Sequence, residues 1–532
     1  MKRNGTIVAL ASIAMLTVAV LAAEPRIDKF VRYESGDIVI YTSRGEAQAR
    51  RFVENLARFR ATLERALGKR ATQNSAPMSI VIAGNTDWRA WLQPRKDIAG
   101  YFQRARFSNY MAMDGNAPAE QTLQLIFHEY THYYLATQFA GEYPPWFNEG
   151  LAELMGYARF QNNKVTLQVP VGHVYQAREG GWIPFAQLIR VDHSDPEYLS
   201  HKLMPSFYAQ SWLAVHYGMV ENRDFGRQIV QYLNELNRLV PQEQAARNAF
   251  GDLAAVDKLL RDYSRRNMIP QGGMTLDNVP TAALSEGKPL EELDAMAIFA
   301  DLMLETRLPP ARIRPLVESL ERRDTNKARA AILSARLAQA DDDNAGFDQA
   351  VERAEAALPP GDWELRRELA SVLLTSGMES SPVSSRKSAD TKRDLVRAHK
   401  WFAEAINHNN RDVEALWGYG TAGTLLDKDL DLAGQALVAA YKLAPSNSEI
   451  SVSLANLKSN QRKPDEMIPY LEDTIRYATD LGTRRWAAET LVEVRAFIVQ
   501  RDKELEENRK QREESEKMLA EYEKMYGKSK KK

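Results

Sequence analysis

The chain has 532 residues, which is longer than one hydrophobic core usually supports, so we expect two to four domains. Its hydrophobic content of 44% and charged content of 27% are those of a folded protein, and a net charge of -1 gives no global attraction to nucleic acid or to anionic membranes. The sequence contains no cysteine, which excludes disulfides, so packing, with or without a bound metal, must hold the fold.

The N-terminus has the pattern of a secretory signal peptide, which we assign to residues 1–23. Two basic residues precede an apolar run, residues 7–21, and two alanines stand before the charged stretch EPRIDK. This pattern predicts cleavage after Ala22 or Ala23. The alternative is an uncleaved anchor, since the run approaches the length that spans a bilayer, and only then do we expect membrane contact. Both interpretations place the remaining chain outside the cytoplasm, in the bacterial periplasm or as a secreted protein.

The next part of the chain predicts a small sheet covered by a helix. DIVIYT (37–42) and MSIVIAG (78–84) are strand-like, and an amphipathic helix is predicted over residues 46–68 between them. The stretch of residues 98–115 alternates apolar and polar side chains, as a hairpin or an edge strand does. With the helices that follow, these elements predict an α+β domain over residues 24–268.

A helical pattern begins at Pro118 and places His128 and His132 on one face. Residues four apart on a helix lie about 5 to 6 Å from each other, so both imidazoles can bind one ion. Zinc suits two neutral imidazoles and a carboxylate, with a fourth position left for water. Glu129 follows the first histidine and leans toward the ion, where it can take a proton from the attacking water.

Three carboxylates compete to be the third ligand. In the stretch YPPWFNEGLAELM, prolines stop the chain, Trp146 and Phe147 are expected in the core, and a new helix is expected to begin near residue 148. Glu149 would point from the first turn of that helix toward the ion. Glu153 shares its face and could accept a hydrogen bond from the outer nitrogen of a ligating histidine. Glu142 lies in the preceding turn, where its direction is not set.

The sequence HEYTH, followed after sixteen residues by the glutamate of NEGLAE, resembles the gluzincin metallopeptidases, and most closely their peptidase MA-like branch. In that branch a signal peptide and tetratricopeptide repeats often accompany the domain. The resemblance covers roughly residues 30–265 and implies a zincin-like fold with zinc as cofactor. It also implies His128, His132 and Glu149 as ligands and Glu129 as the catalytic base.

A further match concerns a tyrosine that stabilises the oxyanion in related aminopeptidases. Tyr208, in SFYAQSWLAVHYG, stands at the matching distance after Glu149; the alternative is an aromatic side chain on a packed helix. The chain lacks the Gly-x-Met-Glu-Asn segment by which those aminopeptidases hold a free amino terminus, which favours an endopeptidase. The other histidines show no ligand spacing and are expected at the surface or in packing: His173, His193, His201, His216, His399 and His408.

The second half of the chain predicts helical repeats. Residues 269–290 carry turn-forming glycines and prolines with little periodicity, which predicts a linker. Over residues 291–500, small and apolar residues recur in steps of 35 and 34 residues, similar to tetratricopeptide (TPR) repeats. The charged residues 501–532 predict a solvated terminal helix, with a basic partner-binding tail as the alternative. The recurring sets are Ala398, Phe402 and Ala405; Ala433, Leu437 and Ala440; Met467, Leu471 and Thr474; with an earlier degenerate set at Ala350, Ala354 and Ala357.

Together these patterns predict an exported zinc endopeptidase with an α+β zincin-like catalytic domain and an all-α TPR-like solenoid. The solenoid would recruit a protein substrate or an envelope partner, and the edge strand within residues 100–113 would hold an extended peptide by backbone pairing. The competing interpretation is a scaffold or binding protein of the envelope. In that case the repeats carry the function and the zinc site is structural or weakly active.

Overall fold

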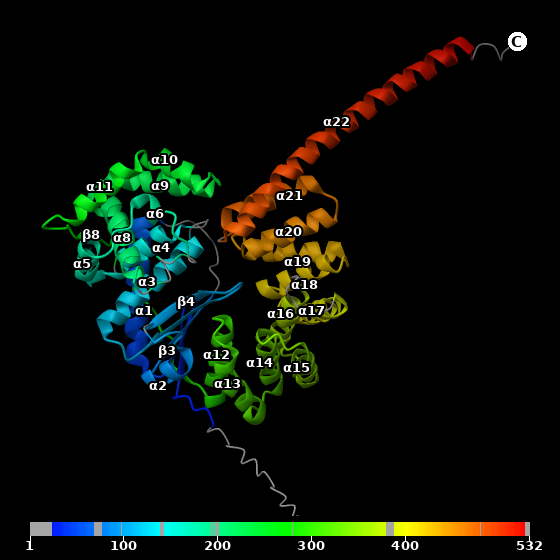
Figure 1. Cartoon of the computed structure of the whole chain (residues 1–532). Helices are drawn as coiled ribbons and strands as arrows, with labels where there is room; N and C mark the ends of the chain where they lie inside the picture. The colour runs from blue at the N-terminus through cyan, green and yellow to red at the C-terminus, as the bar shows by residue number, and fades with distance from the viewer. Residues whose placement is uncertain are drawn as a thin grey trace, which may run out of the picture.

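The computed structural model describes residues 24–68, 77–96, 98–138, 143–192, 195, 197, 200, 202–278, 280–378, 388–478 and 480–526. The predicted signal peptide and Glu142 lie outside these residues. Within them, no helix combines the length and apolar character needed to cross a bilayer. An N-terminal α+β region is followed by a long array of helices (Figure 1).

The α+β region is built on a six-stranded sheet with the order β4-β5-β3-β2-β1-β9. β2, β3 and β5 run parallel, and the other neighbours are antiparallel. The strands predicted at 37–42 and 78–84 are confirmed, and residues 98–115 form a hairpin whose strand β4 is the outermost of the sheet. The bounds are β1 (Val31–Ser35), β2 (Ile38–Thr42), β3 (Met78–Ala83), β4 (Gly100–Arg104), β5 (Asn109–Asp114) and β9 (Lys288–Pro289).

Both faces of this sheet are covered, which explains the apolar run of residues 80–83 in β3. Ile80 and Ile82 belong to the core formed with α1 (Glu46–Leu67) and α3 (Ala119–Gln138). The alternate residues Val81 and Ala83 belong to a second core, formed with the first helices of the array. The predicted helix over 46–68 is therefore α1, and the sheet has a second covered face that the sequence does not predict.

Of the remaining helices of this region, α4 packs against α3, and α5, α6 and α8 to α11 extend the first core, whereas the segment around Trp88 and Leu92 belongs to the second core. A second sheet, with the order β6-β7-β8, lies beside them. The bounds are α2 (Asn85–Asp87), α4 (Pro145–Gly156), α5 (Val171–Glu179), α6 (Phe185–Leu188), α8 (Met204–His216), α9 (Arg223–Asn237), α10 (Gln242–Phe250) and α11 (Leu253–Ser264), the π-helical segments η1 (Trp88–Leu92) and η2 (Tyr217–Glu221), and the strands β6 (Ala158–Gln161), β7 (Lys164–Leu167) and β8 (Gly272–Thr275).

The segment expected to be a linker, residues 269–290, takes part in both sheets. β8 pairs with β7, and β9 pairs with β1. Strands of two to four residues pair through their backbones and need no apolar periodicity, so this segment gives no strand signal in the sequence. The expected boundary at residue 268 therefore falls inside a continuous structural unit.

The second half is an array of antiparallel helix pairs, and the predicted helical repeats are confirmed. Every residue of the three complete recurring sets is buried, and they lie at matching positions of α17, α19 and α21. Close helix contacts explain the small residues, because a Cβ on Gly418 would lie 2.2 Å from the Phe402 ring. The bounds are α12 (Glu292–Glu305), α13 (Pro310–Arg323), α14 (Lys327–Ala340), α15 (Asn344–Ala357), α16 (Trp363–Met378), α17 (Ser388–His408), α18 (Val413–Leu425), α19 (Leu430–Leu443), α20 (Ser448–Asn460), α21 (Pro464–Tyr477) and α22 (Leu481–Tyr526).

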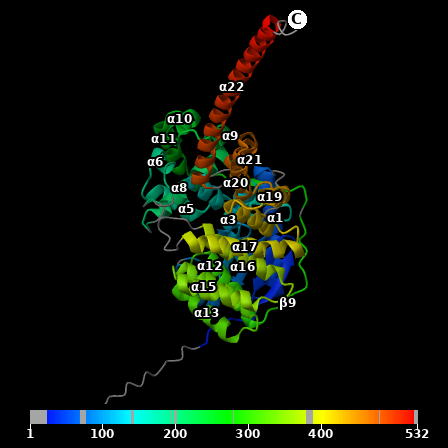
Figure 2. The ribbon, with the colours of Figure 1, turned by 90° about the vertical axis from the view of Figure 1, so that its right-hand side faces the viewer.

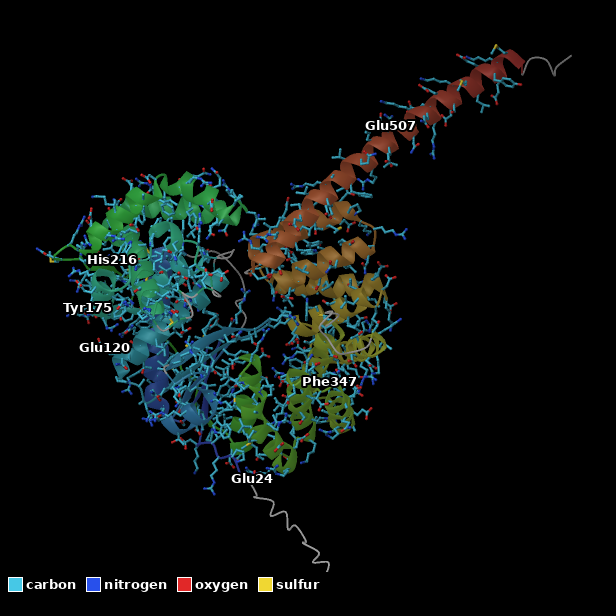
Figure 3. The ribbon with its side chains drawn as sticks, in the orientation of Figure 1. Glu24, Glu120, Tyr175, His216, Phe347 and Glu507 are labelled. Carbon is cyan, nitrogen blue, oxygen red and sulfur yellow. The ribbon has the colours of Figure 1, made fainter. Side chains whose placement is uncertain are left out.

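The array curves back toward the α+β region, so the two parts form a nearly closed ring in Figure 1, and Figure 2 shows the molecule from the side of the array. It starts on the sheet, where α12 to α14 form the second core, and its last helix returns to α9. There the buried Arg484 guanidinium donates to the side-chain and backbone oxygens of Asn237 at 3.1 and 2.7 Å. Beyond this contact α22 projects from the body with its charged side chains in solvent, as around Glu507 in Figure 3, which agrees with the predicted solvated helix.

Candidate metal centre

Helix α3 presents the two histidines of HEYTH on one side and packs through the other. Residues 119–138 contain neither glycine nor proline, so nothing interrupts the helix. Phe127 stacks on Phe59 of α1 with ring centroids 4.2 Å apart, and this contact fixes the rotation of α3 about its axis. His128 and His132 consequently face α4, with their Nε2 atoms 3.1 Å apart.

Helix α4 supplies the carboxylate. It begins at Pro145, three residues before the expected start, because proline is well suited to the first helical position. Trp146 and Phe147 are buried, as predicted, and they anchor the helix in the core. Glu149 is therefore in the second turn rather than the first. Its Oε2 atom lies 3.3 Å from His128 Nε2 and 3.6 Å from His132 Nε2.

These three donor atoms fit a tetrahedral metal. Ligands about 2.0 to 2.1 Å from zinc in tetrahedral geometry are about 3.3 Å from one another, which matches the observed separations of 3.1 to 3.6 Å. Among the described residues, His128, His132 and Glu149 form the one cluster of three potential metal ligands. Two imidazoles and one carboxylate also form the donor set that zinc accepts with a fourth position left open.

The electrostatics of the cluster suit a cation. Burial by itself raises the pKa of Glu149, but the neighbouring charge of His132 and hydrogen bonds from both histidines outweigh it and hold that pKa far below its ordinary value. Burial opposes a charge on His128, yet hydrogen bonds to Glu149 and Glu153 keep its pKa well above the ordinary value. Without a metal ion, the raised pKa of His128 favours a bound proton on its imidazole, and a metal ion that binds there would displace this proton.

A second layer of side chains holds the histidines by their outer nitrogens. His128 Nδ1 lies 3.3 Å from Glu153 Oε1, and His132 Nδ1 lies 3.0 Å from Asn148 Oδ1. The other Glu153 oxygen lies 2.7 Å from His173 Nε2 on α5. The structure thus brings Glu153 to the place expected from the sequence. His173, expected at the surface or in packing, packs beside Tyr157 and Trp212, and its imidazole also contacts Glu153, which the sequence does not predict.

Glu129 connects the cluster to the edge of the sheet. Its Oε2 atom accepts a hydrogen bond from the backbone N–H of Phe102 in β4 at 3.0 Å. Burial raises the pKa of Glu129, against the opposing effect of both histidines. β4 lies at one edge of the sheet, and its Phe102 amide points outward at Glu129. The outer edge of this strand therefore runs past the cluster of His128, His132 and Glu149.

Tyr208 lies on α8, partly buried against the first core. This helix packs closely on α4: a Cβ on Gly150 would lie 2.4 Å from the carbonyl oxygen of Ser211, one turn after Tyr208. Tyr208 is thus on a helix that touches the helix of Glu149, and its contact with an oxyanion stays a prediction.

Three of the other histidines follow the expectation of packing or surface positions. His216 is buried. Its Nδ1 atom accepts a hydrogen bond from the Tyr263 hydroxyl, and its Nε2 atom contacts the Pro270 carbonyl oxygen, both at 3.0 Å. His399 is buried against Tyr419, and His408 is exposed. His193 and His201 lie outside the described residues.

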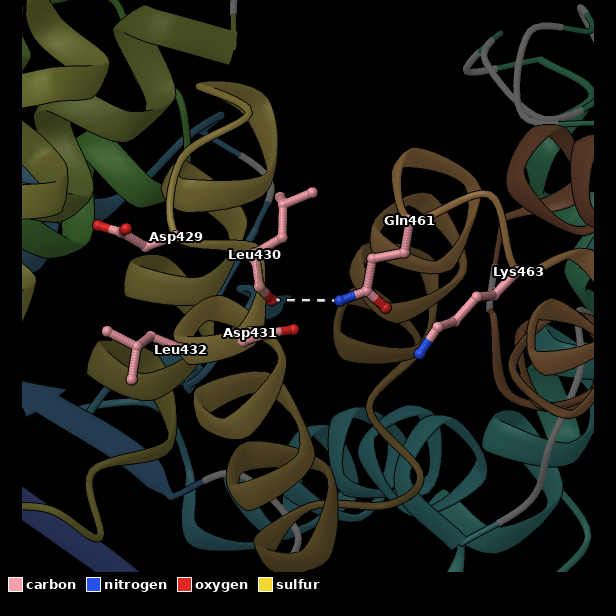
Figure 4. Close-up of a pocket in the computed structure, with 6 residues that line it drawn as sticks. All are labelled: Asp429, Leu430, Asp431, Leu432, Gln461 and Lys463. Atoms are coloured by element: carbon pink, nitrogen blue, oxygen red, sulfur yellow. Dashed lines mark hydrogen bonds between the residues drawn. The ribbon is translucent and has the colours of Figure 1, made fainter.

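A surface depression of about 440 Å³ lies on the repeats, away from this cluster (Figure 4). Gln461 donates to the Leu430 carbonyl across it at 3.3 Å. Its lining, Asp429, Leu430, Asp431, Leu432, Gln461 and Lys463, includes none of the residues named for the metal centre.

Comparison with known proteins finds neither a matching protein family nor a matching curated protein. Solved structures with similar helical repeats include YrrB, described as a TPR protein with an unusual peptide-binding site, at 16% identity over 36% of this chain and 90% of that chain, with a TM-score of 0.28. TTC0263, a thermophilic TPR protein of Thermus thermophilus, has 17% identity over 38% and 99%, with a TM-score of 0.30. Yeast Tom70 has 14% identity over 62% and 69%, with a TM-score of 0.29.

Proposed function

We propose that this protein is an exported zinc-dependent peptidase, and that it cleaves within peptide chains. The observation that supports this best is the cluster of His128, His132 and Glu149, whose donor atoms lie 3.1 to 3.6 Å apart beside Glu129 and the outermost strand. The spacing of HEYTH and NEGLAE, and its resemblance to the zincin-like gluzincins, agrees with this arrangement.

The three ligands would hold zinc, which supplies a Lewis acid that polarises a carbonyl and activates water. Glu149 brings the negative charge that two neutral imidazoles lack. Asn148 and Glu153 accept hydrogen bonds from the outer nitrogens of the histidines and so fix both the ring orientation and the nitrogen that faces the ion.

Glu129 is the general base of the proposal. Its carboxylate would take the proton of the attacking water at one oxygen and pass it to the leaving amine. Burial raises its pKa, which strengthens it as a proton acceptor near neutral pH. The Phe102 amide fixes the orientation of this carboxylate through a hydrogen bond at 3.0 Å. Tyr208 is the proposed donor to the oxyanion.

The edge strand β4 supports an extended peptide as the substrate. An extended peptide can pair with the outer backbone groups of β4, which pass the metal cluster, and this places a peptide bond near Glu129. We propose that the signal peptide directs the protein to the periplasm or outside the cell, and that the repeats bind a protein substrate or partner. The composition favours neither nucleic acid nor membrane as a ligand.

The decisive experiment compares the wild-type protein with Glu129→Gln in metal analysis and in digestion of a peptide library. We expect wild type to bind one zinc and cut internal peptide bonds, and the variant to keep zinc while its turnover falls by about a hundredfold or more. Equal zinc content with no cleavage by either protein would refute the peptidase. An unchanged biological role of the variant would favour the scaffold, in which the repeats carry the function.

A further inference from the structure

The tip of the β4–β5 hairpin is inserted into the repeats. Phe107 packs against Trp417 of α18 with ring centroids 5.0 Å apart, and the Arg106 guanidinium lies 4.8 Å from the centre of the same indole. Arg106 Nε also lies 3.4 Å from a carboxylate oxygen of Glu449, and Asn447 Nδ2 donates to the Arg106 carbonyl at 3.3 Å. The repeats thus hold both side chains and the backbone of the tip.

The receiving side of this contact is buried and hydrogen-bonded. Trp417 is 1% exposed, and its indole N–H donates to Ser453 Oγ at 2.9 Å and to the Glu449 carbonyl at 3.2 Å. The indole that holds Phe107 is therefore fixed by the next helix pair of the array. Glu449, at the start of α20, is half exposed and reaches Arg106 from the outside.

The other end of β4 is fixed by the metal-binding helix. A Cβ on Gly100 would lie 2.4 Å from Leu125 of α3, so the strand touches this helix directly. Two residues on, the Phe102 amide donates to Glu129, and its ring packs edge-on against Tyr133 at 5.9 Å. A strand of five residues is thus held by α3 at one end and by the repeats just beyond the other.

We propose that the repeats α18 to α20 act as a clamp in cis that positions β4 against Glu129, with Phe107 and Trp417 as positioning residues. β4 has a neighbouring strand on one side only, so no second strand holds its outer edge, and contacts with α3 and the repeats must position it. Phe107 lies in the hairpin turn, three residues after β4 ends at Arg104, so a shift of the tip is transmitted directly to the strand. The catalytic consequence rests on the proposed peptidase function, whereas the mechanical coupling does not.

The first test uses Phe107→Ala in the full-length protein, with hydrogen exchange of the β4 amides as the readout. We expect the Phe102 amide to exchange about three- to tenfold faster, the size of effect that the loss of an aromatic pair produces, with zinc content unchanged. Phe107→Tyr, which keeps the ring, should restore exchange close to the wild-type rate. Leu432→Ala, a truncation of an exposed side chain on α19, is the matched control.

The second test changes the repeats and reads the distant site. Glu449→Lys places a positive charge against Arg106 and should accelerate Phe102 exchange and raise KM for a peptide substrate more than it lowers kcat. Glu489→Lys, an equal charge change at an exposed position of α22, should do neither. Exchange and KM that stay at control values in both Phe107→Ala and Glu449→Lys would overturn the clamp. If wild type proves inactive, the peptidase proposal fails, and the exchange rates still decide the clamp.

Discussion

The Glu129 carboxylate accepts a hydrogen bond from the Phe102 backbone amide at 3.0 Å, which links the residue beside the two histidines to the outermost strand of the sheet. Under the proposed peptidase function, a peptide that pairs with β4 would lie next to Glu129, the proposed general base. The position of β4 thus determines the orientation of the Glu129 carboxylate, and in the proposed function it would also determine where a substrate binds.

Replacement of Glu149 should damage zinc binding more than replacement of Glu153. Glu149→Gln exchanges an anionic oxygen for a neutral amide in a site with three protein ligands, so we expect zinc affinity to fall by more than a hundredfold. Glu153→Gln should cost about ten- to a hundredfold, because it holds His128 and does not bind the ion. Chelator competition at one fixed pH measures both. The ligand assignment is refuted if Glu153→Gln is the more damaging change.

His173 should contribute to metal affinity without binding the ion. It lies 2.7 Å from Glu153, so His173→Phe leaves that carboxylate with one restraint fewer on its orientation toward His128. We expect zinc affinity to fall by about tenfold, near the lower limit for outer-shell partners. The same substitution at His408, which is exposed on the repeats, is the control and should have no effect. Equal affinities for the two variants would rule out this role of His173.

A chain that ends at residue 270 should not fold stably. It lacks β8, β9 and the helices that cover Val81, Ala83 and Ala112 on the second face of the sheet, and a large exposed apolar face leads to aggregation. A chain that ends at Ala357 keeps this face covered and should remain soluble and bind zinc. Solubility and metal content of the two purified chains measure the difference. A soluble, zinc-loaded chain ending at 270 would contradict the prediction.

His216 should make stability depend on pH in the acid range. Burial lowers its pKa to about 4, from an ordinary value near 6.5, so the folded state binds fewer protons than the unfolded state between these values. Its contribution is present above about pH 6.5 and is lost as the pH falls toward 4, by up to about 3 kcal/mol.

This dependence can be measured by urea unfolding at pH 7.5 and pH 4.5 for wild type and His216→Gln. The variant should be less stable at pH 7.5, because it loses the contacts of the two imidazole nitrogens with the Tyr263 hydroxyl and the Pro270 carbonyl. Its stability should, however, fall less on acidification. All other titrating groups are common to both proteins and cancel in the comparison. The same acid-induced loss in both would show that His216 does not titrate as described.

Local spacing predicted the centre of the site. His128 and His132 lie on one face of their helix because they are four residues apart. Glu149 and Glu153 lie on one face of the following helix for the same reason, so the sequence alone predicts that the members of each pair are neighbours. The partners of these pairs were not predictable. Asn148 reaches His132 only because α4 begins at Pro145, three residues early, and His173 reaches Glu153 only after two short strands have folded back.

The fold also has parts that the sequence predicts and parts that it does not. The period of the repeats, the first two strands predicted with the helix between them, and the alternating segment 98–115 all follow from regular patterns along the chain. The contact of Phe107 with Trp417, some 300 residues away, follows from no pattern, since one aromatic residue at a hairpin tip is compatible with many surroundings. The second covered face of the sheet could be read only from the continuous apolar run of β3, which also fits a strand in a different kind of core.

The distance along the chain between Phe107 and Trp417 has a consequence during synthesis. A ribosome adding roughly 5 to 20 residues per second needs about 15 to 60 seconds to make the segment between them. Over that interval the histidines, the carboxylate and the hairpin already exist, while the indole that holds the tip does not. The nascent chain therefore contains the candidate metal ligands well before the helix that contacts its hairpin tip, and the contact between Phe107 and Trp417 can form only after α18 has been translated.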